Sequence, residues 1–144
     1  MKNFDKSGLS VVIPTFNELE NIDPLFEKID LFSQNVFFKY EIIIVDGKST
    51  DGTSEKISNT ISKKKHLNVS LIKSDKAEGY GSDICLGLSK TKYELLGWTH
   101  ADLQTDLLDL IKGYTIITES NPELCIVKGR RRGRPIIDNC LTFG

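Results

Sequence analysis

Five short runs of apolar residues recur along the chain, and polar residues bound each of them. The runs are almost continuously hydrophobic, which is typical of strands in a sheet that is covered on both faces. They span residues 9–13, 41–45, 69–72, 93–98 and 124–127. We therefore predict five buried strands.

The segments between these runs have the spacing of amphipathic helices. Apolar residues recur at i, i+3, i+4 and i+7 in two of these segments, and more loosely over residues 84–88. The two sets are Ile22, Leu25, Phe26, Ile29 and Phe32, and Leu107, Leu110, Ile111 and Tyr114. Asn21 is expected to cap the first helix, and "STDGT", residues 49–53, to start the second. The alternation of strands and helices predicts one α/β domain over residues 1–144 with a largely parallel sheet.

Polar residues follow every predicted strand, at the place where parallel α/β sheets bind their ligands. Asp and Ser at such junctions often only cap the next helix. Five polar ends on one edge nevertheless favour a shared crevice. Asp46 and Asp102 would contribute carboxylates to it, and Arg130 and Arg131 would contribute cationic groups.

The residue types at these strand ends suit a ligand with phosphates, a cation and neutral polar groups. Asp46 can accept hydrogen bonds from a base or a ribose. Asp102 with His100 or Gln104 offers oxygen and nitrogen ligands to a divalent metal, and arginines hold phosphate oxygens in bidentate pairs. The glycine turn "EGYGSD", residues 78–83, lets backbone approach a ligand closely where a helix begins. Neither a G-x-G-x-x-G after the first strand nor a P-loop is present, so neither of those nucleotide-binding motifs is supported.

The charge of the chain changes this picture only at one end. The net charge is −1 over 144 residues, which gives no argument for attraction to nucleic acid. Residues 128–144 carry five basic side chains against one acidic one, which suggests an anionic partner there.

Cysteine usage and the N-terminal residues favour a cytoplasmic protein. The three cysteines form no C-x-x-C pair, so a disulfide framework or a zinc site is not expected. Cys85 and Cys125 lie in apolar runs and are expected to be buried. The first residues lack the apolar region of a signal peptide, and no apolar run approaches the roughly 20 residues that span a bilayer.

Four motifs resemble those of family 2 glycosyltransferases. "LSVVIPTFNELENI" resembles the opening strand with P-x-[YF]-N-E, and "IIIVDGKSTDGT" resembles the V-D-D-x-S-x-D-G-T turn. "AEGYGSDICLGLSKTKYELLGWTHADLQTD" resembles the glycine turn and the strand that leads to D-A-D-L-Q, and "VKGRRRGRP" resembles the later G-S-R region. The motifs stand in family order over nearly the whole chain. The D-A-D-L-Q form is most similar to the members that glycosylate polyprenyl phosphates, the dolichol-phosphate mannose synthase group.

This resemblance implies a GT-A fold, a nucleotide-diphosphate sugar donor, transfer with inversion, and Mn²⁺ or Mg²⁺. It also implies a polyprenyl phosphate acceptor at the inner face of a membrane, a role in cell-envelope polysaccharide synthesis, and no nucleic-acid partner. Carried over by position, the donor-binding residues are Pro14, Thr15, Asn17, Glu18, Asp46, Lys48, Ser49, Gly79, Gly81 and Ala101. The implied catalytic residues are Asp102 and Arg131, and the implied metal ligands are Asp102, Gln104 and His100.

The chain departs from the family pattern at two positions. Gly47 replaces the second Asp of V-D-D, so that one nucleotide contact is missing or is replaced by Lys48. His100 replaces the first Asp of D-A-D, and histidine suits Mn²⁺ better than Mg²⁺. Enzymes of this family also continue well beyond 144 residues, so we expect the donor-binding, N-terminal part of a longer enzyme.

Two other readings of the sequence remain open. The first is a nucleotide-sugar-binding module without turnover, which the departures at positions 47 and 100 favour. The second is a flavodoxin-like regulatory domain, in which Asp75 would accept a phosphoryl group and Lys128 would assist it. Within the turn after residue 98, Asp102 is expected to serve the ligand site, and Thr105 or Asp106 to cap the next helix.

Overall fold

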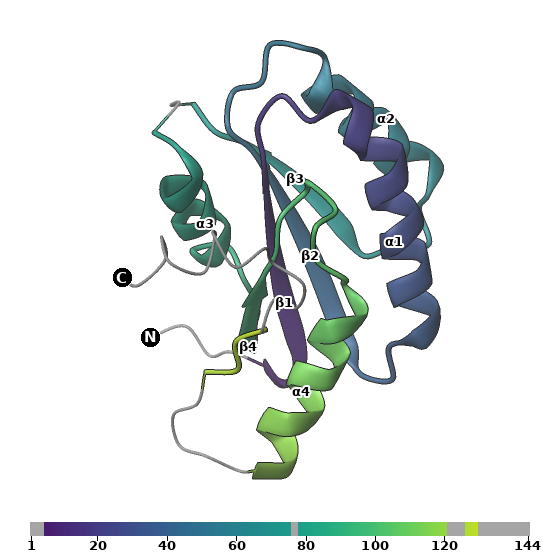
Figure 1. Ribbon diagram of the computed structural model, residues 1–144, viewed down its shortest axis with the longest axis vertical. Helices are drawn as coiled ribbons and strands as arrows, with labels where there is room; N and C mark the ends of the chain where they lie inside the picture. Colours follow the sequence, from purple (N-terminus) through teal and green to yellow (C-terminus); the bar gives the residue numbers. More distant parts are fainter. Residues whose placement is uncertain (1–4, 76–77, 121–125, 130–144) are drawn as a thin grey trace, which may run out of the picture.

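Four parallel strands form the sheet of the computed structural model, in the order β3-β2-β1-β4 (Figure 1). The structure describes residues 5–75, 78–120 and 126–129. The elements in chain order are β1 (Asp5–Thr15), the 3₁₀ turn η1 (Leu19–Asn21), α1 (Ile22–Asn35), β2 (Lys39–Asp46), α2 (Thr53–Lys63), β3 (Val69–Lys73), α3 (Tyr80–Leu88), β4 (Tyr93–Trp98) and α4 (Leu108–Ser120). The predicted α/β class and parallel sheet are confirmed.

The main core lies between the sheet and helices α1, α2 and α4. Alternate residues of β1 and β2 point into it, and so do the five apolar residues of α1 that the sequence pattern singled out. Two of these, Phe26 and Phe32, are almost fully buried, and each contributes about 1.5–3 kcal/mol by leaving water. The 3.6-residue period of α1 therefore matches the face that it buries.

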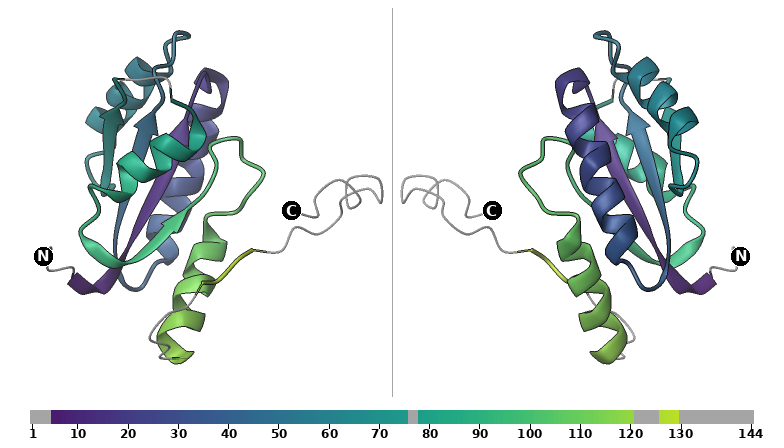
Figure 2. Two further views of the ribbon diagram at one scale, coloured as in Figure 1. Left: turned by 90° about the vertical axis from the view of Figure 1, so that its left-hand side faces the viewer. Right: turned by 90° about the vertical axis from the view of Figure 1, so that its right-hand side faces the viewer.

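Helix α3 covers the opposite face of the sheet, as the two side views show (Figure 2). It packs closely on Val12 and Val45 because Gly87 has no side chain. A Cβ at Gly87 would lie 2.4 Å from Cγ1 of Val12. The missing side chain at Gly87 therefore lets the last turn of α3 lie directly on β1 and β2.

Three local expectations are corrected by the structure. Ile126 and Val127 belong to no strand, and Ile126 is 84% exposed, so the described part of the predicted fifth strand does not pair with the sheet. Leu124 and Cys125 lie outside the described residues. Asn21 has a helical backbone because η1 runs directly into α1, and its side chain makes no cap hydrogen bond. Cys85 is exposed, since Asp83 and Gly87 occupy the sheet-facing side of α3.

The order of the strands places a switch point beside β1. The chain passes from β1 through α1 to β2 on one face of the sheet, and from β3 through α3 to β4 on the other. Ligands of such sheets bind beyond the carboxyl ends of the strands where the order reverses. Among the described residues, no helix combines the length and apolar character that crossing a bilayer requires.

Candidate nucleotide-sugar site at the carboxyl edge of the sheet

The loop after β1 and the turn after β2 are bonded to each other side by side. The Asn17 N–H donates to Oγ of Ser49 at 2.9 Å, and the Thr50 N–H donates to Oδ1 of Asn17 at 2.9 Å. Asn17 adopts a φ of 53°, a left-handed conformation that asparagine tolerates better than most residues. We call residues 15–21 and 46–53 together the clasp.

Asp46 ends β2 inside the clasp and is only 2% exposed. Its carboxylate accepts the Ser49 hydroxyl at 2.5 Å and the Ser49 N–H at 3.2 Å. The next peptide is held as well, because the Gly47 N–H donates to the Thr15 carbonyl at 2.8 Å. Asp46 is therefore fixed in place before any ligand arrives, with lone pairs left to accept further hydrogen bonds.

Asp51 and Thr53 close the other end of the clasp. Asp51 accepts the Leu19 N–H at 3.1 Å and the Thr53 hydroxyl at 2.6 Å, and the bond from Thr53 is the main cause that holds the pKa of Asp51 below its usual value. The Thr53 hydroxyl oxygen accepts the Glu18 N–H at 2.9 Å. The sequence interpretation missed both residues as site-forming groups, although "STDGT" contains them.

The remaining predicted donor residues of this half lie in or beside the clasp. Pro14 is buried in β1 opposite Val45, and the Thr15 hydroxyl donates to the Val45 carbonyl at 3.2 Å. Glu18 accepts the Asn21 amide at 2.5 Å. Lys48 is exposed with a φ of 69°.

The first turn of α3 connects the clasp to the end of β4. The Tyr80 ring stacks on His100 with centroids 4.8 Å apart and planes 9° apart, and its hydroxyl lies 3.1 Å from Nε2 of His100. Burial and the nearby Asp102 carboxylate raise the pKa of Tyr80. Gly79 precedes this turn with a φ of 92°, and a Cβ at Gly79 or Gly81 would meet nothing within 4 Å. The predicted glycine turn therefore leaves open space beside Tyr80.

The loop after β4 separates the roles of its two acidic residues. Asp106 caps α4, because its Oδ1 accepts the Leu108 N–H at 3.0 Å. Asp102 accepts the Gln104 N–H at 3.1 Å and stays partly exposed. Lys28 of α1 supports the loop through the carbonyls of Leu103, at 2.9 Å, and Thr105, at 3.1 Å.

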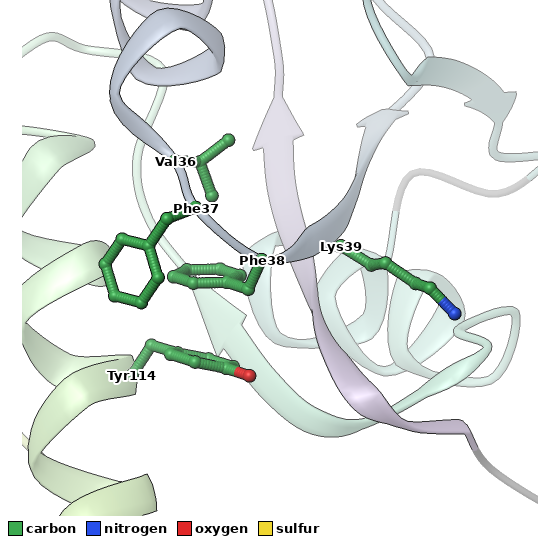
Figure 3. Close-up of a pocket in the computed structure, with 5 residues that line it drawn as sticks. All are labelled: Val36, Phe37, Phe38, Lys39 and Tyr114. Atoms are coloured by element: carbon green, nitrogen blue, oxygen red, sulfur yellow. The ribbon is translucent and has the colours of Figure 1, made fainter.

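A second concave region lies at the opposite, amino edge of the sheet and differs in chemistry. Figure 3 shows this pocket of about 690 Å³, which Val36, Phe37, Phe38, Lys39 and Tyr114 line. The rings of Phe38 and Tyr114 stack with centroids 3.6 Å apart. With Lys39 as its one charged lining residue, it lacks the carboxylates that gather at the carboxyl edge.

One family model matches the part of the chain that carries the four motifs and the strand ends. The model described as "Glycosyl transferase family 2" matches residues 10–136. The chain belongs to glycosyl transferase family 2.

Relatives of this family 2 chain include two enzymes named for dolichyl phosphates. The chain is 38% identical over 96 residues to the dolichol-phosphate mannosyltransferase of Pyrococcus furiosus, a match that covers 67% of this chain and 26% of that protein. It is 31% identical over 136 residues to the dolichyl-phosphate beta-glucosyltransferase of Dictyostelium discoideum, covering 88% of this chain and 41% of that one. The chain thus spans less than half the length of either relative.

Two solved glycosyltransferases share the fold of this family 2 chain. The mannosyltransferase PcManGT of Pyrobaculum calidifontis, in complex with GDP-Man and Mn²⁺, aligns with a TM-score of 0.63 at 22% identity, over 78% of this chain and 33% of that one. TarS 1-349 of S. aureus, in complex with UDP-GlcNAc, aligns with a TM-score of 0.66 at 23% identity, over 88% and 37%. The expected GT-A fold is confirmed.

Among the described residues, Asp102 is the carboxylate that fits the divalent metal which the family implies. No group of three His, Cys, Asp or Glu side chains that could hold a metal occurs among the residues that the structure describes. His100 Nε2 contacts Tyr80 instead, and Gln104 meets Asp102 through its backbone N–H. Asp102 has the hard oxygen donors that Mg²⁺ and Mn²⁺ accept together with substrate phosphates, so it would hold a metal that the donor brings.

The structure does not place two of the predicted site residues, Ala101 and Arg131, at the site. Ala101 is 3% exposed and belongs to the main core cluster, so its side chain faces the protein rather than the site. Arg131 lies outside the described residues, and its predicted phosphate contact stays a prediction.

Asp83 is a buried acid beside the clasp that the sequence interpretation left out. It lies in the first turn of α3 and is 4% exposed. Burial is the largest cause that raises its pKa, the carboxylates of Asp46 and Glu78 raise it further, and a hydrogen bond with Ser74 opposes them. The sequence does contain a signal for this residue. Asp83 ends the glycine turn "EGYGSD" and lies four residues before Gly87, so both face the same side of the helix.

Proposed function

We propose that this chain is the donor-binding part of an inverting glycosyltransferase that moves a sugar from a nucleotide-diphosphate sugar to polyprenyl phosphate. The observation that carries the proposal is the clasp, which presents the buried Asp46 at the carboxyl edge of a parallel sheet. A rigid carboxylate there favours hydrogen-bond donors of a base or ribose and disfavours phosphate.

The diphosphate of the donor would then extend toward the loop after β4. Asp102 stands there as a partly exposed carboxylate beside Tyr80 and His100. A Mn²⁺ or Mg²⁺ ion bound with the donor would neutralise the charge of the leaving diphosphate. Asp102 would hold that ion, Gln104 would orient Asp102 through its N–H, and the glycine turn would let backbone approach the phosphates.

The names of the relatives support a polyprenyl phosphate as the acceptor. The oxygen of a phosphate acceptor is already ionised near neutral pH, so attack on the sugar needs no general base. A single displacement of this kind inverts the anomeric centre. The reaction would take place at the inner surface of a membrane, with Arg131 assisting the phosphates and the product feeding cell-envelope polysaccharide synthesis.

The test is a calorimetric titration of UDP-, GDP- and dTDP-sugars into the chain, with Mn²⁺, with Mg²⁺ and with EDTA. We expect one of these donors to bind with micromolar to millimolar affinity. We also expect sugar transfer when polyprenyl phosphate in vesicles is added to a longer enzyme that contains this chain and has the length of its relatives. A folded chain that binds none of the donors would refute the proposal.

A binding module without turnover is the second candidate, and the Tyr80–His100 contact favours it. His100 stands where the family has a carboxylate, and its Nε2 is engaged by the Tyr80 hydroxyl. Donor binding without any product from the longer enzyme, across all the sugars that bind, would support this candidate over the first.

A further inference from the structure

A side chain at position 47 would collide with the carboxylate of Asp83 in this fold. A Cβ added to Gly47 would lie 2.5 Å from Oδ2 of Asp83 and 3.4 Å from the Thr15 carbonyl oxygen. Asp83 is short, 4% exposed and held in the first turn of α3, so it has little freedom to move aside. The carboxylate of Asp83 therefore fills the space over the Gly47 backbone, next to Asp46.

The second oxygen of this carboxylate has no hydrogen-bond donor among the residues that the structure describes. Oδ1 of Asp83 is shielded from solvent and unpartnered, while Ser74 bonds to the carboxylate. Buried polar atoms in native proteins are almost always paired, so an orphan acceptor points to a missing water, ion or ligand. The open space at Gly79 and Gly81 lies on the same turn.

Asp83 would not have to be buried if it served only to stabilise the start of α3. An acidic residue in the first turn of a helix is favourable to the helix dipole when it is exposed to water. Asp83 is instead placed against Asp46, whose negative charge disfavours its ionised form. Two adjacent carboxylates repel phosphate and attract N–H and O–H donors, so this corner suits the nucleoside end of a donor.

We propose that Asp83 is a specificity residue: its carboxylate, which occupies the space over Gly47, accepts an N–H of the donor's nucleobase beside Asp46. The carboxylate comes from α3 rather than from the turn after β2. This proposal rests on the proposed function and deepens it.

The direct test compares nucleotide binding by the wild type, Asp83→Ala and Asp83→Asn in calorimetry, with UDP and GDP as probes. Each variant is expected to bind the preferred nucleotide about tenfold or more weakly, as for the loss of a hydrogen bond to a charged group. Asp109→Asn is the matched control, because it removes a carboxylate from the first turn of α4, and it is expected to bind as the wild type does.

An N-methylated nucleotide separates a contact with the base from an indirect effect. The analogue blocks the ring N–H of uracil or guanine, so the wild type is expected to lose most of its affinity for it. Asp83→Ala, which has already lost the acceptor, is expected to bind the methylated and parent nucleotides equally. An undiminished preference of Asp83→Ala for the parent nucleotide would overturn the proposal.

A third experiment moves the carboxylate from Asp83 in α3 to position 47 in the turn after β2. Gly47→Asp alone is expected to weaken binding, because its Cβ collides with Asp83. Gly47→Asp combined with Asp83→Ala is expected to bind more tightly than Asp83→Ala.

The outcomes separate this proposal from the proposed function. No nucleotide binding by the wild type would refute the proposed function. Wild-type binding that Asp83→Asn and Asp83→Ala both retain would refute the role of Asp83 and assign the orphan oxygen to a water. If Asp83→Ala does not fold, the folded Asp83→Asn variant and the double variant decide.

Discussion

The turn after β2 and the loop after β4 both end a parallel strand at the same edge of the sheet, yet they are held in different ways. The turn after β2 is bonded along its length to the loop after β1, through Asn17, Ser49, Asp51 and Thr53. The loop after β4 is held by hydrogen bonds from Lys28 to its backbone carbonyls, and Asp102 stays partly exposed.

This difference implies a division of work between the two ends of the donor. When the hydrogen bonds of a site exist before binding, ordering the site around the ligand costs less free energy. The clasp is preorganised in this sense, and it presents a carboxylate that suits a base or ribose. In the loop after β4, Asp106 caps α4 and Asp102 is left as a carboxylate that a metal and a diphosphate would complete. We therefore expect that binding of the nucleoside does not require a metal, and that binding of the diphosphate does.

The largest expected effect comes from removing the acceptor at the centre of the clasp. Asp46→Ala should weaken donor binding by roughly 1–3 kcal/mol, the range for a lost hydrogen bond to a charged group. Calorimetry with the preferred nucleotide measures this loss, and the circular dichroism spectrum checks that the fold is retained. Unchanged affinity in a folded variant would remove Asp46 from the donor site.

A smaller effect is expected from loosening the clasp without touching the ligand. Thr53→Val keeps the shape of a fully buried side chain but deprives the Glu18 N–H and Asp51 of their partner, so it should cost about 1–1.5 kcal/mol of unfolding free energy. Thr60→Val is the control, since its hydroxyl bonds to the Lys56 carbonyl within α2 and not to the clasp. Urea denaturation that shows equal stability for the two variants would mean that the clasp is not a stabilising unit.

The smallest effect is a pH dependence at Asp83, where the clasp meets α3. Burial, with the charges of Asp46 and Glu78, raises the pKa of Asp83 above 3.8 in the folded protein, against the Ser74 hydrogen bond. Ionisation of Asp83 therefore lowers stability at neutral pH. Asp83→Asn should melt at a higher temperature than the wild type at pH 7, and this advantage should shrink as the pH falls through the raised pKa and vanish below 3.8. A difference in melting temperature that does not change with pH would contradict this assignment.

The sequence pattern was sufficient for the framework of the fold and insufficient for the contacts that shape the site. Continuous apolar runs located four strands, because the sheet is covered on both faces, and the 3.6-residue spacing located α1, because that helix buries one face. The apolar run over residues 124–127 predicted a strand that Ile126 and Val127 do not join, because a short apolar run does not show whether a partner strand is available.

The polar contacts of the site were harder to predict because they join residues that are distant in the chain. Asn17 meets Ser49 across 32 positions, and only the register of β1 with β2 brings them together. Asp83 becomes a buried acid because Gly87 lets α3 approach the sheet, a consequence of packing that no local motif expresses. The ends of the predicted strands and the family resemblance both pointed to Asp46 and Asp102, and the structure added Asp51, Thr53 and Asp83 as candidates.

The measurement that tests the division between the two ends most directly is a titration of a nucleoside monophosphate and of the full nucleotide-sugar donor. Both ligands are titrated into the wild type and Asp102→Asn, with Mn²⁺ and with EDTA. Asn keeps the size of Asp102 and one acceptor oxygen but loses the charge that a cation requires. We expect the monophosphate to bind equally in all four conditions, and the donor to bind tightly only to the wild type with Mn²⁺. Equally tight donor binding by the wild type in EDTA would contradict the account and make Asp102 a direct contact of the sugar or ribose.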